Sequence, residues 1–412
     1  MAQADRDWSE HALSAELTLT ETLGAEGGTT NAQINLDANA NAAPTPIVIK
    51  AVVEALQRGA NPSSAHAAGE IARAMLEKAR DAVIALSEGV YPENVIFTSG
   101  CTEANNLVVA SHARRGGVLI TSAVEHPSLL RPAEALSNAG FEVRILPVDR
   151  DGLVDLETLA AWLNETTGPV TVSIQTANSE TGVVQPIATI ANLIARFEAV
   201  LFHSDAAQSF GKQLTLVGRG RGPDMVSISG HKLHAPMGVG ALLVHEEETR
   251  LTPQLLGGEQ EQGLRAGTQA LPMIAGLAVA CAERARSLAQ DAQRMALLRD
   301  RLEAGVLAAL PRAVVNGGRA PRLPNVTNLL FPGVDAMSIV ANLDAEGVLA
   351  SQGSACSSRR PEPSHVLRAM GLSENEAFSC VRFSVSPLNT ETEIDTAITA
   401  IAKVYQRLEM CA

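Results

Sequence analysis

The sequence lacks an excess of basic residues, a long apolar run and paired cysteines, and each absence excludes a class of protein. Its 412 residues include 32 Lys and Arg against 45 Asp and Glu, a formal net charge of -13, so we expect no direct nucleic-acid partner. No uninterrupted apolar run reaches the roughly 20 residues that span a bilayer, so no membrane partner is expected either. The most apolar stretch, residues 271–282, contains Pro272 and Gly276 and predicts the start of a buried helix.

Cysteines are odd in number and widely spaced, and none belongs to a C-x-x-C pair. The five are Cys101, Cys281, Cys356, Cys380 and Cys411. This pattern predicts neither a disulfide framework nor a metal site, and it is typical of a reducing compartment. Residues 1–32 carry six acidic residues against Arg6 alone and have no apolar core, unlike a signal or transit peptide. We therefore expect a cytoplasmic protein in which residues 1–32 form a flexible extension.

Length and composition predict a folded protein of two to three domains. At 46% hydrophobic and 19% charged residues, most of the chain is too apolar to be disordered. A helix is expected from about residue 66 until Gly89, because apolar residues recur there at steps of three and four. Beyond it, short apolar runs alternate with helical segments. We expect strands at 95–97, 118–121, 142–146, 170–174, 200–203, 225–228 and 239–244.

Continuous apolar strands separated by helices predict an α/β fold with a mostly parallel sheet covered on both faces. We expect this large domain to span residues 33–285. Residues 286–412 differ in character, with a long helix, short strands and two further helices, and predict a small α+β domain. Ligands of such sheets bind beyond the carboxyl ends of the strands.

Two residues at strand ends suggest a pyridoxal phosphate (PLP) chemistry. Lys232 follows a strand in Ser-Gly-His-Lys, where partial desolvation favours a free amine able to form a Schiff base. Asp205 ends another strand, where its carboxylate can keep a pyridine nitrogen protonated. Taken alone, Lys232 is more simply a surface lysine, and Asp205 the N-cap of a helix that starts at Ala206.

Other strand ends add donors for a phosphate and an aromatic ring. The turn 97–104 leads from a strand into a helix, and its backbone N–H groups with the hydroxyls of Ser99 and Thr102 form an anion cradle. A capping box to Glu103 is a compatible structural explanation. Ser229 and His231 flank the lysine and add donors. His126 follows a further strand, where an imidazole can stack on a ring and exchange protons.

Cys356 stands out among the cysteines because of its surroundings. It lies in a run of small and polar residues, 351–360, which predicts a mobile loop, whereas an arbitrary cysteine is usually a small buried hydrophobe. Two adjacent arginines, Arg359 and Arg360, favour its nucleophilic thiolate form.

Taken together, these segments resemble the PLP-dependent cysteine desulfurases of the class-V aminotransferase family, which have the fold-type I architecture. The resemblance extends from about residue 35 to residue 408. The matching segments are 36–40, 61–64, 97–100, 102–103, 125–126, 180–182, 205–208, 229–232, 265–268, 353–356 and 382–384.

The resemblance implies a cysteine desulfurase that converts L-cysteine to L-alanine, with Lys232 as the cofactor-bearing lysine and base. Cys356 would accept the sulfur as a persulfide, and His126 would stack on the ring. The implied cofactor-binding residues are Cys101, Thr102, His126, Asn178, Asp205, Gln208, Ser229, His231, Lys232 and, from the second subunit of a homodimer, Thr268. The implied substrate-binding residues are Asn39, Asn178 and Arg382. A sulfur-acceptor protein, for example in iron–sulfur cluster assembly, is the implied partner.

The sequence departs from the family at several positions, and alternative functions stay open, of which a non-catalytic scaffold rests on these departures. Ser179 stands where an asparagine is usual, and Asn41 and Ala42 replace residues that usually carry hydroxyls. A selenocysteine lyase or a small class-V aminotransferase would use the same lysine and aspartate. A non-catalytic sulfur-trafficking scaffold is the third hypothesis.

Overall fold

A seven-stranded sheet forms the centre of the larger lobe in the computed structural model, which describes residues 33–245, 251–353 and 362–410. Its strand order is β3-β10-β9-β7-β6-β4-β5, and only β10 runs antiparallel to its neighbours. The strands are β3 (Val95–Thr98), β10 (Gly240–Val244), β9 (Met225–Ser229), β7 (Val200–Asp205), β6 (Val170–Ser173), β4 (Val118–Ser122) and β5 (Glu142–Leu146). The seven strands predicted from apolar runs are confirmed, as is the mostly parallel sheet.

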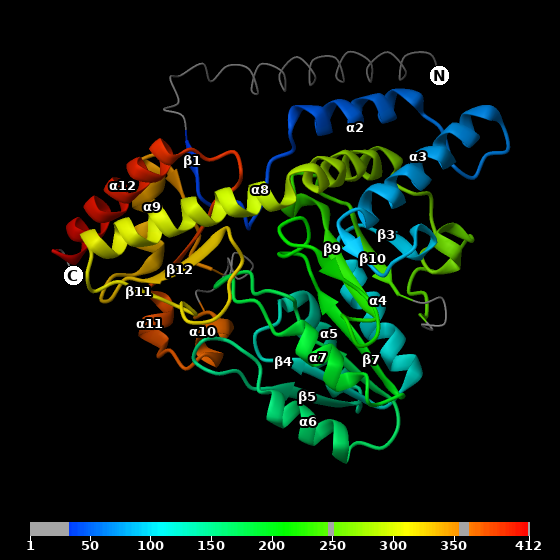
Figure 1. Cartoon of the computed structure of the whole chain (residues 1–412), viewed down its shortest axis with the longest axis horizontal. Helices are drawn as coiled ribbons and strands as arrows, with labels where there is room; N and C mark the ends of the chain where they lie inside the picture. Colours follow the sequence, from blue (N-terminus) through cyan, green and yellow to red (C-terminus); the bar gives the residue numbers. More distant parts are fainter. Residues whose placement is uncertain (1–32, 246–250, 354–361, 411–412) are drawn as a thin grey trace, which may run out of the picture.

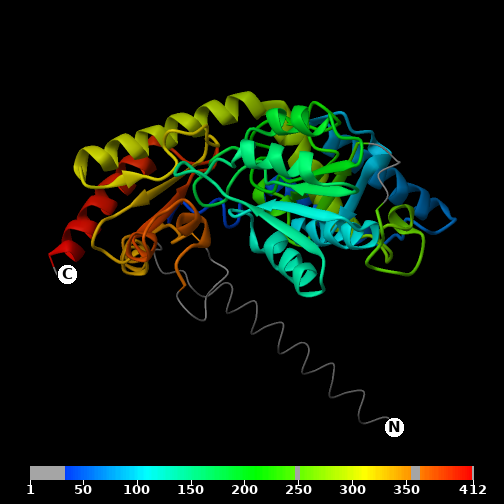
Figure 2. The ribbon, with the colours of Figure 1, turned by 90° about the horizontal axis from the view of Figure 1, so that it is seen from below.

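Helices cover both faces of this sheet, as Figure 2 shows. In β4, Leu119 packs with α4 and α5, whereas its neighbours Val118 and Ile120 pack with α6 and α7 on the opposite face. Such alternation along a strand is the expected result of a period of two. A third set of buried hydrophobic residues, from α2, α3 and the first half of α8, packs on β3, β9 and β10. The helices are α2 (Pro46–Arg58), α3 (Ala67–Ile84), α4 (Cys101–Arg115), α5 (Pro127–Asn138), α6 (Leu156–Glu165), α7 (Ile187–Ile194) and α8 (Leu271–Ala309).

The smaller lobe has a three-stranded antiparallel sheet, in the order β11-β12-β14, packed against α9, α12 and the second half of α8. Figure 1 shows α8 extending from α2 and α3 in the larger lobe to α12 in the smaller one. The N-terminal strand β1 joins this lobe by pairing with β13. The elements are β1 (Ile34–Asn35), β11 (Val314–Val315), β12 (Val326–Leu330), α9 (Ala336–Ala345), β13 (Val348–Leu349), α10 (His365–Ala369), α11 (Glu374–Phe378), β14 (Cys380–Ser384) and α12 (Glu391–Glu409).

Two predictions of helix extent need comment. The helix expected to continue to Gly89 ends at Ile84, because β2 (Ser87–Glu88) pairs with β8 (Thr215–Leu216) from a distant part of the chain. The helix expected at residue 271 does begin there and continues for 39 residues. The predicted domain boundary, 285/286, lies within α8, and the division into domains stays a prediction.

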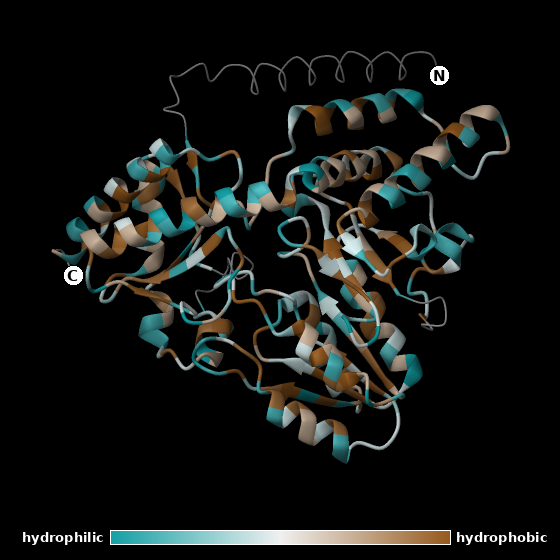
Figure 3. Cartoon of the chain, in the orientation of Figure 1, coloured by the Kyte–Doolittle hydropathy of each residue, from teal (hydrophilic) through white to brown (hydrophobic). Residues whose placement is uncertain are grey.

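Hydrophobic residues make up much of the central strands, whereas the helices carry both hydrophobic and polar residues, as the hydropathy colours of Figure 3 show. Within the described ranges, no helix is long and apolar enough to cross a bilayer.

The remaining short elements are the 3-10 helices η1 (Pro92–Asn94), η2 (Gly230–Lys232) and η3 (Gln260–Gly263). Of these, η2 places the predicted lysine directly after β9.

Candidate active site

A cavity of about 520 Å³ lies at the carboxyl ends of the parallel strands. This volume is within the range of small-molecule sites, and its position follows the rule for open α/β sheets. The smaller lobe contributes Gly353, His365 and Arg382 to its wall. Eleven of the predicted site residues line it: Asn39, Cys101, Thr102, His126, Asn178, Asp205, Gln208, Ser229, His231, Lys232 and Arg382.

Two predicted residues are not brought into this cavity. Thr268 is exposed and does not line it. Cys356 lies outside the described residues. The described cavity therefore brings together the other predicted cofactor- and substrate-binding residues, without the predicted sulfur acceptor.

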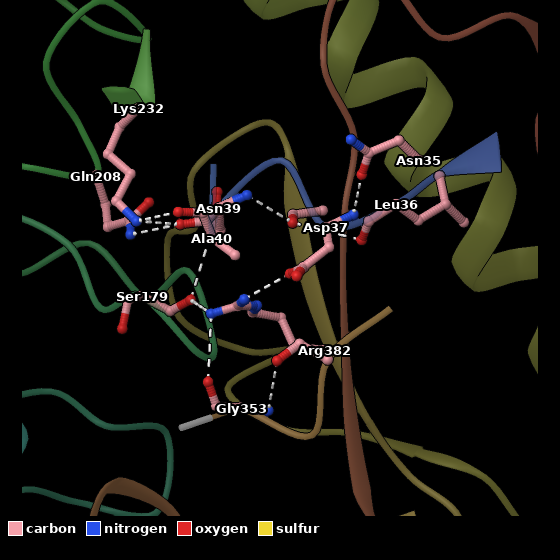
Figure 4. Close-up of polar contacts among 12 residues, drawn as sticks. Asn35, Leu36, Asp37, Asn39, Ala40, Ser179, Gln208, Lys232, Gly353 and Arg382 are labelled. Carbon is pink, nitrogen blue, oxygen red and sulfur yellow. Dashed lines mark hydrogen bonds and ion pairs between the residues drawn. The ribbon is translucent and has the colours of Figure 1, made fainter. Parts of the chain in front are cut away.

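Lys232 is held toward the cavity by backbone carbonyl groups. Its Nζ donates to the carbonyl oxygens of Asn39 at 2.6 Å and Ala40 at 2.8 Å (Figure 4). The Nε2 of Gln208 also donates to the Asn39 carbonyl oxygen, at 3.3 Å. Residues 39–40 thus supply hydrogen-bond acceptors for the Lys232 amine when that amine forms no covalent bond to a cofactor.

Asp205 ends β7 and is buried with three hydrogen-bond donors around its carboxylate. Asn105 Nδ2 donates to Oδ2 at 2.7 Å, while the backbone N–H of Ala207 and the thiol of Cys101 donate to Oδ1 at 2.9 and 3.2 Å. Burial, followed by the charge of Asp205, raises the pKa of the Cys101 thiol well above its usual value, so this thiol stays protonated as a donor. The structural alternative for Asp205 is wrong, because no helix starts at Ala206.

His126 is the N-cap of α5, and its hydrogen bonds determine which ring nitrogen carries the proton. Its Nδ1 accepts from the backbone N–H of Ser128 at 3.1 Å and lies 2.8 Å from Ser128 Oγ. A backbone N–H can only donate, so Nδ1 is unprotonated and the neutral ring carries its proton on Nε2. Burial, together with the charges of Lys232 and His365, lowers the pKa of His126, although Asp205 opposes this shift.

Asn105 connects the aspartate with the histidine, a link that the sequence analysis missed. Its Nδ2 donates to Ser128 Oγ at 2.9 Å as well as to Asp205. Asn105 is fully buried on α4, four residues after Cys101, so both side chains face Asp205. The i, i+4 spacing was the available signal, but it gains meaning only once α4 is known to pack under β7.

We expect Ser128→Ala to lower kcat/KM for the implied substrate, L-cysteine, by about two- to tenfold near neutral pH, which is the usual effect of one lost hydrogen bond. The hydroxyl stabilises the neutral ring by donating to Nδ1, so its loss raises the pKa of His126 and moves the acid limb of the profile to higher pH. A pH series of kcat/KM measures this shift. Ser137→Ala, on the exposed side of α5, is the matched control. An unchanged acid limb in Ser128→Ala would contradict the assignment.

The anion cradle predicted for residues 97–104 corresponds to the turn at the start of α4. Gly100 is the N-cap and provides no side-chain capping bond, while Glu103 reaches back to accept from the Ser99 N–H at 2.8 Å. Arg265 holds the other oxygen of Glu103, with Nε to Oε1 at 2.9 Å. A Cβ on Gly240 would lie 2.7 Å from the Gly100 Cα, so only glycine allows β10 to approach this turn.

Ser229 and His231 line the same cavity as this helix end and form a pair, with Ser229 Oγ 3.1 Å from His231 Nδ1. Burial, followed by the charge of Lys232, lowers the pKa of His231 to about 4, so it acts as a neutral hydrogen-bonding group. Hydroxyl groups, an imidazole and a helix N-terminus together suit a phosphate monoester.

Two carboxylates without a predicted role are also buried in the cavity wall. Burial raises the pKa of Glu125 to about 8, despite hydrogen bonds from Ser122 and the Gln175 N–H. Burial likewise raises the pKa of Glu180, whose Oε2 accepts from Ser364 Oγ at 2.6 Å. Glu125 is therefore neutral near pH 7, and its hydrogen bonds to Ser122 and Gln175 fix the backbone next to His126 without adding a charge to the cavity wall.

The donor set fits PLP. A lysine amine, a buried carboxylate and an anion cradle match its aldehyde, its pyridine nitrogen and its phosphate, and all three border one cavity. The Oε1 of Gln208 is buried without a partner in the described residues, and so it remains available to a bound group.

Comparison with known proteins agrees with this chemistry. The family described as Aminotransferase class-V matches residues 34–396. The chain belongs to the class-V aminotransferase family. Among its relatives are the cysteine desulfurase IscS 1 of Archaeoglobus fulgidus, 39% identical over 375 residues (89% of this chain, 96% of that one), and the cysteine desulfurase NifS of Azotobacter vinelandii, 38% identical over 381 residues (92% and 94%).

Solved structures of similar proteins show the same fold. A NifS-like protein from Rickettsia africae superimposes with a TM-score of 0.82 at 33% identity, covering 91% of this chain and 99% of that one. A structure described as SspA in complex with cysteine gives a TM-score of 0.74 at 31% identity, covering 87% and 100%. The predicted resemblance to PLP-dependent cysteine desulfurases, the fold-type I architecture and the PLP cofactor are therefore confirmed.

Proposed function

We propose that the chain converts L-cysteine to L-alanine and transfers the sulfur to Cys356 as a persulfide. The observation that carries this proposal is the single cavity in which Lys232, Asp205, His126 and Arg382 meet. Relatives at nearly 40% identity over about nine-tenths of the chain are named cysteine desulfurases, which supports this substrate. The role of Cys356 rests on its sequence context and on that family membership.

Each residue of the cavity then has a chemical role. The N-terminus of α4, Thr102, Ser229 and His231 would hold the cofactor phosphate, and the partner-subunit copy of Thr268 would complete this set. Asp205 would pair with the pyridine nitrogen, His126 would stack on the ring, and Gln208 and Asn178 would approach its oxygen. When bound, PLP supplies stabilisation of negative charge at the substrate Cα. The Lys232 amine removes the proton from that atom, and Asn39 and Arg382 orient the substrate.

Exposed apolar residues support the homodimer that Thr268 requires. Thr268 is exposed and does not line the large cavity of its own subunit. Large apolar side chains are also exposed on α2 and in the loops around residues 237 and 255–256, a pattern typical of a buried interface. They are Ile47, Ile49, Val53, Leu56, Met237, Leu255 and Leu256.

Product analysis of the purified holoenzyme tests this function. We expect L-cysteine to yield alanine and protein-bound sulfur in equal amounts before any reductant is added. Accumulation of a keto acid would indicate an aminotransferase, and turnover of selenocysteine alone would indicate a selenocysteine lyase. A protein that stays colourless after incubation with PLP would favour a non-catalytic scaffold.

Delivery of the sulfur to an acceptor protein, as in iron–sulfur cluster assembly, is part of this proposal, as is a cytoplasmic location. The described cysteines, Cys101, Cys281 and Cys380, are all free thiols and suit a reducing compartment. Co-purification with the persulfide-loaded protein is the way to identify the acceptor.

A further inference from the structure

Asp37 forms an ion pair with the predicted substrate-binding arginine. Its Oδ1 accepts from Arg382 Nη2 at 2.6 Å, as Figure 4 shows. Asp37 comes from the segment after β1, and Arg382 from β14, 345 residues further along the chain. Ser384 holds the two together, because its N–H donates to the Leu36 carbonyl oxygen at 2.6 Å and its carbonyl oxygen accepts from the Ala38 N–H at 3.2 Å.

The guanidinium group of Arg382 is buried and needs a counter-charge even without substrate. Its side chain is 4% exposed, against 26% for Asp37. A buried cation without a partner is strongly unfavourable, so Asp37 stabilises both the charge and the position of this group. The other hydrogen bonds of the guanidinium group are longer, with Nη1 donating to the carbonyl oxygens of Ser179 at 3.2 Å and Gly353 at 3.4 Å.

Asp37 contacts the guanidinium group of Arg382 from outside the cavity. Arg382 lines the cavity, whereas Asp37 does not. The Nε of Arg382 has no partner among the described residues. A guanidinium has five N–H donors in one plane, so a carboxylate behind it leaves donors for a second carboxylate from the cavity.

We propose that Asp37 is a positioning residue that keeps the guanidinium group of Arg382 directed at the carboxylate of the substrate amino acid. The same segment binds Lys232 through the carbonyl oxygens of Asn39 and Ala40. It therefore sets the separation between the group that binds the substrate carboxylate and the amine that acts at Cα. This inference deepens the proposed function and rests on it for the identity of the substrate.

The test is Asp37→Asn in the holoenzyme, with binding and turnover measured separately. L-alanine carries a carboxylate and ethylamine does not, and the absorption spectrum of the bound cofactor reports the binding of both. We expect Kd for L-alanine and KM for L-cysteine to rise by about 10- to 100-fold, because the amide oxygen of asparagine can still accept a hydrogen bond but does not replace the negative charge of the ion pair. Kd for ethylamine stays unchanged, and kcat changes far less than KM.

Two controls separate positioning from a general loss of structure. Asp395→Asn removes a comparable Asp–Arg pair on the surface, where Asp395 Oδ1 lies 2.7 Å from Arg301 Nε, and should change neither Kd. In an Arg382→Ala background, Asp37→Asn should add little, because the two residues act through one contact. Asp37→Glu should recover part of the L-alanine affinity.

Three results would overturn the inference. They are an unchanged Kd for L-alanine in Asp37→Asn, a lower Kd, which would make Asp37 a competitor of the substrate, and equal losses for L-alanine and ethylamine. The proposed function fails separately if the wild-type protein releases no alanine from L-cysteine. The comparison of L-alanine with ethylamine tests Asp37 in that case as well.

Discussion

Replacing Lys232 with alanine lowers kcat/KM for L-cysteine by at least about 10³-fold, the first of the two largest effects that we expect. Proton transfer by a positioned side chain contributes about 10²- to 10⁴-fold, and Lys232 is also the residue to which the cofactor is attached. Steady-state kinetics measures the loss. Reduction of the holoenzyme with borohydride, followed by peptide mapping, should label position 232 in the wild-type protein and no peptide in the variant.

Lys212 is the rival amine and supplies the control. It is buried, and burial together with the charge of Lys232 lowers its pKa to about 7, so its amine has the nucleophilicity that a Schiff base requires. Its Nζ, however, donates to the Gln208 carbonyl oxygen at 2.8 Å, and it does not line the large cavity. Lys212→Met should keep the label at position 232. A label at position 212 in the wild-type protein would contradict the assignment of Lys232.

The fold was predictable where local sequence and tertiary structure agree. Strands buried on both faces must be continuously apolar, so the central strands were visible as short runs of Val, Ile and Leu. The end of α3 was not predictable in this way. The apolar periodicity continues to Leu86, but the chain forms no helix beyond Ile84, because the residues of β2 pair with β8, more than 120 residues away in the sequence. Local spacing carries no information about such a partner.

The same distinction applies to the site. Lys232, Asp205 and His126 could be predicted because the carboxyl ends of parallel strands meet at one edge of a sheet. Asn105 and Asp37 could not. Asn105 reaches Asp205 from within a helix, across 100 residues, and Asp37 reaches Arg382 across 345. Residues that position the functional groups become visible only through contacts between distant segments.

Cys356→Ser abolishes persulfide formation, the second of these effects, while cofactor binding persists. In the proposed step, the Cys356 thiolate forms an S–S bond with the substrate sulfur. The C–S bond of the substrate breaks, and its electron pair stays on the Cβ carbon, which is protonated to give alanine. A serine hydroxyl is not ionised near neutral pH and cannot accept sulfur in this way. Mass spectrometry of the protein after one turnover detects the added sulfur atom.

Chain length permits Cys356 to reach the cavity, although the residue itself lies outside the described ranges. Gly353 lines the cavity wall, and three residues of chain extend no further than about 11 Å. Beyond the undescribed segment, Ser364 is bound to Glu180 in the same wall, at 2.6 Å. The described residues on both sides of the segment, Gly353 and Ser364, therefore lie at the cavity wall or contact it.

The described cysteines are poor substitutes for Cys356 because they are protonated. Burial raises the pKa of Cys101 well above its usual value and that of Cys380 to about 12. Cys411→Ser, which changes the other cysteine outside the described ranges, is the matched control and should keep the persulfide. In Cys356→Ser, L-alanine should still change the spectrum of the bound cofactor. A persulfide that persists there and maps to another cysteine would assign the nucleophile to that residue instead, because only a thiolate within reach of the substrate sulfur can form the bond.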